Sequence, residues 1–336
     1  MFWIRKILYP ISAIYFIITS FRNILFNCKI LKSKKFPIPL IGIGNLSTGG
    51  TGKTPMAEYI FENFSQKFNL ALLSRGYKRS SLGYIKASST SSPKLIGDEP
   101  YQIFKKFKNI QVAVDEKRVR GVNNLIRENK NLRGIVLDDC FQHRSISLRL
   151  NILLTTYNKP FFSDCILPSG NLRESLNSYK RADIIIVTKC PDNLKESEMK
   201  VFCNSINLMK HQNLFFTSIS YNNTLFGTSN IEIEELKKSK VLLVTGISNI
   251  SPLIEYLNNK NVQFDHITFS DHHNYSSKDI SRIEKEFGDR IVVTTEKDYK
   301  KIKNLNLNNK LFYLEIKTTF LKDEGAFKSL IYDALN

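Results

Sequence analysis

Hydrophobic and polar positions follow two different patterns along this chain. Near the N-terminus, residues 7–21 are fifteen consecutive positions without a charged side chain. From residue 36 onward, short apolar runs end in small or acidic residues and are separated by polar stretches that suit helices. Such runs are typical of strands that a parallel sheet buries on both faces. The pattern therefore predicts an α/β fold with a parallel sheet flanked by helices.

The predicted strands fall into two series, which indicates two domains. The first series comprises residues 39–44, 70–73, 134–137, 151–155 and 183–188, and the second comprises 241–245, 266–269 and 291–295. Segments 214–227 and 311–321 show no helical period, and we interpret them as paired connectors. A length of 336 residues agrees with two domains at roughly 100 to 200 residues each. The expected division is a helix over 1–30, a core domain over 31–213, and the connectors with a smaller C-terminal α/β domain over 214–336.

The apolar N-terminal segment is expected to form a membrane-associating helix. Fifteen helical residues span about 22 Å, less than the roughly 30 Å of a bilayer's hydrocarbon core. Apolar side chains lie all round the helix, and Trp3, Tyr9 and Tyr15 suit the membrane interface. The cations that follow favour a cytoplasmic location for the rest of the chain. Whether the helix spans the bilayer, lies on it or is a buried core helix stays open, whereas a cleaved signal peptide is disfavoured because no small-x-small site follows.

Composition narrows the class of protein and the kind of partner. With 42% hydrophobic and 24% charged residues, the chain is neither disordered nor a multi-span membrane protein. Its five cysteines show no C-x-x-C spacing, which suits reduced thiols in the cytosol and disfavours a zinc site. The net charge of +18 favours anionic partners such as nucleotides, phospholipid surfaces or nucleic acid, without choosing among them.

The most specific local motif follows the first predicted strand. It reads Gly-Asn-Leu-Ser-Thr-Gly-Gly-Thr-Gly-Lys-Thr-Pro over residues 44–55 and precedes a predicted helix. In such loops, backbone N–H groups surround phosphate oxygens and the helix N-terminus adds its positive dipole. Lys53 is expected to reach the β and γ phosphates, and the Thr54 hydroxyl to bind Mg²⁺. Gly is usual where Ser47 stands, but the other features agree with a nucleotide site. The expected nucleotide-binding residues are Ser47, Thr48, Gly49, Gly50, Thr51, Gly52, Lys53 and Thr54.

A phosphate loop also needs a carboxylate for its metal ion, commonly at the end of a neighbouring buried strand. The sequence supplies two adjacent acids, Asp138 and Asp139, directly after the predicted strand at 134–137. Adjacent residues of a strand point to opposite faces, so the two carboxylates are not expected to do the same job. Which of them serves the metal ion stays open.

Longer motifs make the chain resemble the tetraacyldisaccharide 4′-kinases, the membrane-associated lipid A 4′-kinases of Gram-negative bacteria. Besides residues 44–55, the motifs are Leu-Ser-Arg-Gly-Tyr at 73–77, Gly-Asp-Glu-Pro at 97–100, Asp-Asp-Cys-Phe-Gln-His at 138–143, Leu-Pro-Ser-Gly-Asn-Leu-Arg-Glu at 167–174, Arg-Ala-Asp at 181–183, Phe-Ser-Asp-His-His at 269–273 and Thr-Thr-Glu-Lys-Asp at 294–298. They occur in the family's order and cover most of the chain, which is far more specific than any one motif.

The resemblance implies a reaction and assigns residues to it. The family transfers the γ-phosphate of ATP to the 4′-hydroxyl of a tetra-acylated glucosamine disaccharide 1-phosphate at the inner membrane, giving lipid IVA. By this resemblance, ATP and Mg²⁺ are the cofactors, and Asp139, with Asp138, serves the metal ion. Asp98 resembles the family's catalytic carboxylate, paired with His272, and domain closure is expected to bring the two together. Residues that the resemblance marks as substrate contacts or supports are Glu99, Gln142, His143, Arg173 and Glu174.

Three positions depart from the family's usual pattern. Cys140 stands where Gly or Ala is usual, Asn171 where Pro is common, and Lys78 with Arg79 where glycines are usual. None of them carries assigned chemistry. They leave the local backbone geometry near Lys78 and Asn171 open.

Two other functions compete with that of a lipid sugar kinase. A membrane-bound NTPase switch often has a Lys immediately before the Gly-Gly of its phosphate loop, where this chain has Thr48. A nucleic-acid-binding protein is favoured by charge alone, because no motif interleaves aromatic and basic residues. The expected partners are therefore the acylated disaccharide and the cytoplasmic face of the inner membrane, with no nucleic acid and no obligate protein partner.

Overall fold

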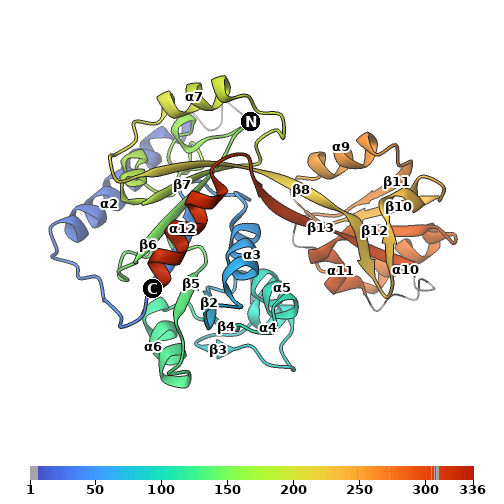
Figure 1. Ribbon diagram of the computed structural model, residues 1–336, viewed down its shortest axis with the longest axis horizontal. Helices are drawn as coiled ribbons and strands as arrows, with labels where there is room; N and C mark the ends of the chain where they lie inside the picture. The colour runs from blue at the N-terminus through green and yellow to red at the C-terminus, as the bar shows by residue number, and fades with distance from the viewer. Residues whose placement is uncertain (1–6, 248, 272, 304, 306, 308–309) are drawn as a thin grey trace. The chain divides into compact units, whose positions relative to one another are not determined.

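The computed structural model describes residues 7–247, 249–271, 273–303, 305, 307 and 310–336. The chain divides into two compact units. Unit 1 comprises Met1–Ile219 with Thr318–Asn336, and unit 2 comprises Ser220–Lys317. The chain passes from unit 1 to unit 2 within strand β8 (Asn213–Gly227) and returns within strand β13 (Leu311–Phe320), so both expected connectors are strands (Figure 1).

Unit 1 is built on a predominantly parallel sheet whose strand order is β8-β7-β6-β1-β5-β2-β4-β3. The pairing of β3 with β4 at one edge is antiparallel, whereas β8-β7, β7-β6, β6-β1, β1-β5, β5-β2 and β2-β4 pair parallel. The strands are β1 (Leu40–Asn45), β2 (Leu70–Ser74), β3 (Ile85–Lys86), β4 (Gln111–Val114), β5 (Gly134–Leu137), β6 (Leu150–Thr156) and β7 (Ile184–Thr188). The five strands expected in this part of the chain are confirmed, and β3 and β4 are additional. β1 lies between β5 and β6, so the loop that follows it starts at the centre of the sheet.

Alternate residues of the central strands serve two cores, one on each face of the sheet. In β1, Ile41 and Ile43 belong to one cluster of buried side chains, whereas Leu40 belongs to the cluster on the opposite face. The helices that follow the strands cover these faces: α3 (Lys53–Phe64) packs on β1, α5 (Asp98–Lys106) on β4, and α6 (Arg118–Glu128) on β2 and β4. Further helices of the unit are α4 (Pro93–Ile96), η1 (Phe161–Ser163), η2 (Leu176–Arg181) and α7 (Glu196–Ser205).

The last helix, α12 (Glu324–Leu335), packs in unit 1, although the sequence division assigned it to the C-terminal domain. Phe327 is fully buried, and its ring lies 5.8 Å from that of Tyr59 on α3 and 5.5 Å from that of Phe215 on β8. Ile331 and Leu335 continue the same apolar stripe into the core beneath β1. Helix α12 thus packs on the face of the sheet that α3 covers (Figure 1).

Helix α2 (Tyr9–Asn27) extends further than the expected 7–21. Polar side chains of α2 are buried and apolar ones are exposed, the reverse of a helix in a soluble core. Its buried residues are Ser12 and Asn23, while its isoleucines are exposed, Ile14 by 60% and Ile18 by 61%. Among the described residues, α2 is the helix that is long and apolar enough to cross a membrane. A buried core helix, one of the open alternatives, does not agree with this exposure.

Unit 2 is a smaller α/β unit with its own parallel sheet in the order β11-β10-β12-β13. Its strands are β9 (Asn230–Glu232), β10 (Val241–Thr245), β11 (Phe264–Thr268) and β12 (Ile291–Thr295), and β9 pairs antiparallel with the end of β8. Its helices are α8 (Ile233–Leu236), α9 (Ser251–Asn259), α10 (Ser277–Phe287) and α11 (Glu296–Ile302). Separate clusters of buried apolar side chains lie on the two faces of this sheet. The second predicted series of strands is therefore confirmed.

Candidate active site

The predicted phosphate loop connects the centre of the unit 1 sheet to helix α3. Gly49 and Gly52 have φ angles of 110° and 88°, a region that side-chain-bearing residues rarely adopt. Gly52 is the N-cap residue of α3, and Lys53 and Thr54 form its first turn. Asn45, at the end of β1, donates from Nδ2 to the Thr51 hydroxyl at 2.9 Å. The loop therefore ends at a helix N-terminus, where backbone N–H groups and the helix dipole favour an anion.

Lys53 and Asp139 lie together, with Arg173 on the same carboxylate. Lys53 Nζ is 3.4 Å from Asp139 Oδ1, and Arg173 Nη1 donates to both carboxylate oxygens at 2.9 and 3.0 Å. Burial acts to raise the pKa of Asp139, but Lys53 and Arg173 outweigh it and lower the pKa. Asp139 itself has a φ of 46°. Three residues that lie far apart in the sequence thus form one charged cluster at the carboxyl ends of β1 and β5.

Asp138 faces a different environment from its neighbour, as expected for adjacent positions. Its Oδ2 accepts a hydrogen bond from the Ser74 hydroxyl at 3.1 Å, while Oδ1 is buried without a partner among the described residues. Burial raises the pKa of Asp138, opposed by the nearby charge of Lys53 and reinforced by that of Asp139. Glu99 is also close enough to raise this pKa. The predicted residues Lys53, Glu99, Asp138 and Asp139 are therefore gathered in one place.

Asp98 is the first residue of α5, and two glycines position it. Gly97 has a φ of 93°, and a Cβ there would lie 3.1 Å from the backbone of Gly76. This close approach joins the loop after β2 to the start of α5. Asp98 is partly exposed, so its carboxylate lies at a helix N-terminus within reach of solvent.

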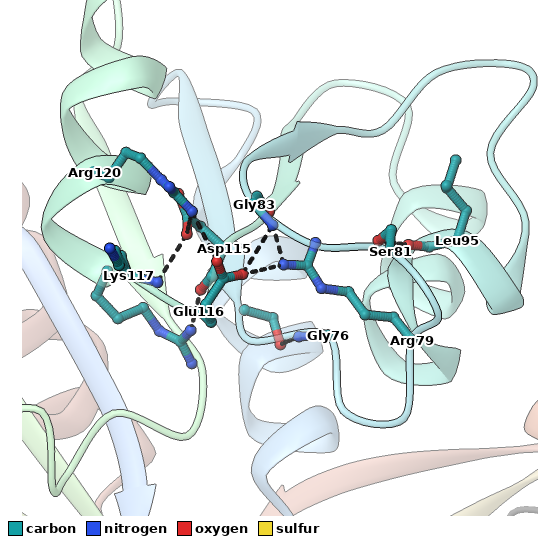
Figure 2. A network of polar contacts seen from close by, with 11 residues as sticks. Gly76, Arg79, Ser81, Gly83, Leu95, Asp115, Glu116, Lys117 and Arg120 are labelled. Carbon is teal, nitrogen blue, oxygen red and sulfur yellow. Dashed lines mark hydrogen bonds and ion pairs between the residues drawn. The ribbon is translucent and has the colours of Figure 1, made fainter.

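The loop after β2 is held by an ionic network that the sequence did not predict (Figure 2). Arg79 donates from Nη2 to the Gly83 carbonyl and to Glu116 Oε2, each at 2.7 Å. The pKa of Glu116 is lowered to about 2 by hydrogen bonds from the backbone N–H groups of Glu116 itself and of Gly83, against the effect of burial. Lys78 has a φ of 59°, which explains why a glycine is usual in this stretch. The Arg79 side chain, through its bonds to Gly83 and Glu116, anchors the loop that packs on Gly97.

The predicted supports form a second, largely buried cluster behind Arg173. Glu174 Oε1 accepts hydrogen bonds from Arg181 at 2.7 Å and from Gln142 at 3.2 Å, and its Oε2 accepts one from Asn23 at 2.7 Å. Gln142 Nε2 also donates to the carbonyl of Asn45, at the end of β1. Glu174 therefore ties the segment that carries Arg173 to helix α2.

His143 is half-buried beside these residues. Burial, with the nearby charge of Arg118, lowers its pKa to about 4, so its imidazole is neutral at physiological pH. Arg118, which the sequence reasoning missed, is buried and donates to the backbone carbonyls of Asp115 and Asp138. Its position at the start of α6 gave no motif by which the sequence reasoning could have found it.

The departures from the family's pattern at Cys140 and Asn171 have local explanations. Cys140 is buried, and a Cβ on Gly42 would lie 2.7 Å from its sulfur, so the glycine makes room for the thiol. Asn171 donates from Nδ2 to Asp164 at 2.9 Å, and its backbone N–H donates to the same carboxylate at 3.2 Å. These bonds hold the turn at the position where a proline is common.

His272, the predicted partner of Asp98, lies outside the described residues. Its neighbour His273 is described and takes part in a local cluster of unit 2. His273 Nε2 lies 3.0 Å from Asp279 Oδ2, and its ring stacks on Phe269 at 4.7 Å. The pairing of Asp98 with His272 stays a prediction.

The residues present fit a Mg²⁺ ion held together with a nucleotide. Mg²⁺ takes oxygen ligands and usually binds through one or two carboxylates with substrate phosphates and water. The buried Oδ1 of Asp138 is an oxygen of this kind without a protein partner, whereas both oxygens of Asp139 already accept hydrogen bonds from Arg173. Among the described residues, no group of three or more His, Cys, Asp or Glu side chains converges as a metal site.

Comparison with known proteins identifies the family of this chain. The family model described as LpxK, tetraacyldisaccharide-1-P 4′-kinase, matches residues 4–336. The chain belongs to this family. Among its curated relatives is the tetraacyldisaccharide 4′-kinase of Flavobacterium johnsoniae, 43% identical over 325 residues, which are 96% of this chain and 95% of the relative. That of Bacteroides thetaiotaomicron is 43% identical over 88% of this chain and 82% of the relative.

A solved structure of the family has the same fold. The crystal structure of "apo" form LpxK from Aquifex aeolicus in complex with ATP matches with a TM-score of 0.81 and 30% identity, over 99% of this chain and 100% of that one. The resemblance inferred from the motifs is confirmed, and with it the kinase class and the α/β fold. The alternative of an NTPase switch is not favoured by this membership.

Proposed function

We propose that this chain transfers the γ-phosphate of ATP to the 4′-hydroxyl of a tetra-acylated glucosamine disaccharide 1-phosphate, producing lipid IVA at the cytoplasmic face of the inner membrane. Its family membership supports the reaction. The observation that carries the assignment to this site is the cluster of Lys53, Asp139 and Arg173 at the end of the phosphate loop.

The loop from Ser47 to Thr54 is assigned to the triphosphate. Lys53 and Arg173 bring two positive charges to the loop's end, and Asp139 pairs with both of them. A triphosphate competes with Asp139 for both cations, so Asp139 holds them in position until the nucleotide binds. Asp138 and the Thr54 hydroxyl are the groups assigned to Mg²⁺, which when bound neutralises charge on the phosphate oxygens.

Asp98 is assigned to the acceptor alcohol. The acceptor oxygen forms a bond to the γ-phosphorus as the bond from that phosphorus to the β,γ-bridging oxygen breaks, and ADP leaves. The alcohol's proton passes to the Asp98 carboxylate late in the step, because the transition state of phosphoryl transfer is loose. The start of α5, fixed by the Gly76–Gly97 contact, gives this carboxylate a defined position. His272 remains its predicted partner.

Helix α2 is assigned to the membrane surface, with its axis along the bilayer rather than across it. Its polar side chains bind other segments of unit 1: Tyr15 donates to the carbonyl of Arg173 at 2.8 Å, and Arg22 donates to that of Gln142 at 2.9 Å. A helix held along its length by such bonds keeps one face on the protein and offers its exposed apolar face to lipid. Lysines after the helix, Lys29, Lys32, Lys34 and Lys35, add attraction to anionic headgroups of roughly 1 kcal/mol each.

Phosphate transfer by the Lys53→Met variant tests this function. The full chain is supplied with Mg-ATP and the disaccharide lipid in detergent, and mass spectrometry follows the addition of one phosphate. We expect the wild type to add it, and Lys53→Met to lose about 100-fold or more in rate, because electrostatic stabilisation of the transferring group is lost. The exposed Lys67→Met, just beyond the other end of α3, is the matched control and should retain wild-type activity.

Two outcomes would overturn the proposal. Unchanged transfer by a folded Lys53→Met would remove the loop from the reaction. Fast ATP turnover without any lipid sugar, together with no phosphorylated lipid, would favour the NTPase switch instead.

A further inference from the structure

Three successive carbonyl groups of the phosphate loop are each held by a side chain from outside the loop or at its edge. Asn45 Nδ2 donates to the carbonyl of Gly49 at 3.4 Å. Lys189 Nζ donates to the carbonyl of Gly50 at 2.7 Å, and the Thr188 hydroxyl donates to that of Thr51 at 2.9 Å. The contact from Asn45 is long, so the stronger bonds come from Thr188, the last residue of β7, and from Lys189, which follows it.

These bonds determine where the loop's N–H groups point. In a planar trans peptide, the carbonyl of one residue and the N–H of the next point in opposite directions. Holding the carbonyls of Gly50 and Thr51 on the side of β7 therefore turns the N–H groups of Thr51 and Gly52 to the other side. The Gly50–Thr51 peptide would otherwise be free to rotate, because glycine permits many backbone conformations and Gly50 is exposed.

The backbone around Lys189 is shaped for this contact. Lys189 has a φ of 57°, a sparsely populated region for a residue with a side chain, in which strain is associated with function. Its neighbours are fixed on both sides. The Thr188 hydroxyl lies 3.1 Å from the carbonyl of Thr155 as well, and the N–H of Cys190 donates to the carbonyl of Thr217 at 3.0 Å. The Lys189 side chain is thus presented to the loop from the carboxyl end of β7, between two neighbours that are held by hydrogen bonds.

We propose that Lys189, together with Thr188, is a positioning residue that orients the peptide N–H groups of the phosphate loop before nucleotide binds. The proposal rests on the assignment of this loop to the triphosphate. It differs from a role as a direct phosphate ligand, since Lys189 already donates to the loop's own backbone. A loop that is oriented in advance loses less conformational entropy when the nucleotide binds.

Steady-state kinetics with three variants is the first half of the test. We expect Lys189→Met to raise the KM for ATP about 5- to 10-fold, the range for loss of one hydrogen bond, and to leave the KM for the disaccharide lipid unchanged. Lys189→Arg, which can still donate, should recover most of the wild-type KM. The control is Lys200→Met, an exposed lysine on α7, which should leave both constants unchanged.

Backbone dynamics of the nucleotide-free full chain in detergent is the second half. Amide ¹⁵N order parameters of Gly50, Thr51 and Gly52 are expected to fall from about 0.85 toward 0.6 in Lys189→Met and to stay high in Lys200→Met. A direct phosphate ligand would not change them, because no phosphate is present. Unchanged order parameters therefore overturn the proposal even if the KM for ATP rises, and so does an unchanged KM for ATP.

Failure of the proposed function gives a different result. If Lys53→Met bound and used ATP normally, the loop would not be the nucleotide site. The order parameters of Lys189→Met would still decide whether Lys189 orients the loop.

Discussion

Two adjacent aspartates of the site have opposite electrostatic environments. Asp139 meets Lys53 and Arg173, and its pKa is lowered despite burial. Burial instead raises the pKa of Asp138, and one of its carboxylate oxygens has no partner among the described residues. Because a nearby cation favours the charged form of a carboxylate, a metal ion at Asp138 would reverse this shift. The expectation that the two residues do different jobs therefore stands on a physical difference, although their roles remain proposals.

His143 gives a residue-scale prediction about pH. Its pKa is lowered from 6.5 in the unfolded chain to about 4 in the folded protein, so between these values the unfolded chain binds more protons. Its contribution to stability is therefore present above pH 6.5 and is lost as the pH falls toward 4, with an upper limit of about 3 kcal/mol. Urea unfolding at pH 7.5, 6 and 5 should show a smaller acid loss in His143→Gln than in the wild type. His211→Gln, an exposed control, should follow the wild type. An equal loss of unfolding free energy between pH 7.5 and 5 in all three proteins would contradict the lowered pKa of His143.

At the scale of elements, helix α2 connects the membrane proposal to the active site. One face carries exposed isoleucines, and the other carries the polar side chains that bind the segments around Gln142, Arg173 and Glu174. Two further contacts hold the helix near its two ends: Ser12 donates to the Ser169 hydroxyl at 2.7 Å, and Arg144 donates to the Asn27 side chain at 2.8 Å. A membrane-bound α2 would therefore present the site at a fixed height above the lipid.

Variants of the two faces of α2 should affect different properties, vesicle binding for the apolar face and stability for the polar face. The double variant Ile14→Ser with Ile18→Ser removes exposed apolar area, so it should weaken binding to anionic phospholipid vesicles while the melting temperature stays within a few degrees. Asn23→Ala leaves a buried oxygen of Glu174 without its partner. It should lower the free energy of unfolding by about 1–3 kcal/mol and leave vesicle binding unchanged. Vesicle flotation and thermal unfolding measure the two effects. A loss of stability without a loss of flotation in the isoleucine variant would contradict the assignment of the apolar face of α2 to lipid.

At the scale of the whole molecule, the last segment of the chain, after unit 2, belongs to the core of unit 1. The core beneath β1 receives α3 and β2 early in the sequence and α12 at its end. Phe327 contributes a fully buried ring to that core, which includes Tyr59, Phe215 and Phe320. Because unit 2 has its own cores, a defect under β1 is expected to leave unit 2 folded.

Phe327→Ala tests this division. The buried cavity should lower the stability of unit 1 by about 3–5 kcal/mol. Hydrogen exchange should therefore accelerate in β1 and β5 and remain slow in β10 and β12 of unit 2. Tyr332→Ala on the same helix, at a residue that is 45% exposed, should have a much smaller effect. Equal acceleration in the strands of both units would mean that the chain unfolds as one block.

Much of the fold follows from local sequence signals because each signal acts within a short stretch of chain. The apolar runs at 134–137 and 241–245 are strands at the predicted bounds. β4 was missed because its four residues, Gln-Val-Ala-Val, include a polar position and are too few to show a period. The phosphate loop and the paired aspartates were predicted from residue types and spacing, whereas the family was inferred from the resemblance of the longer motifs and is confirmed.

Relations between distant residues were decided by tertiary structure alone. The sequence placed α12 with the C-terminal domain, since nothing local records that its apolar stripe fits the sheet of unit 1. Likewise, α2 reads as apolar all round, yet a few polar side chains select the face that meets the protein. Lys189, Arg118 and Arg79 carry no motif, because their partners are backbone carbonyls and carboxylates brought near only by folding. Residue identity and short-range periodicity thus specify elements and chemistry, whereas contacts between distant segments depend on packing that no single stretch of sequence encodes.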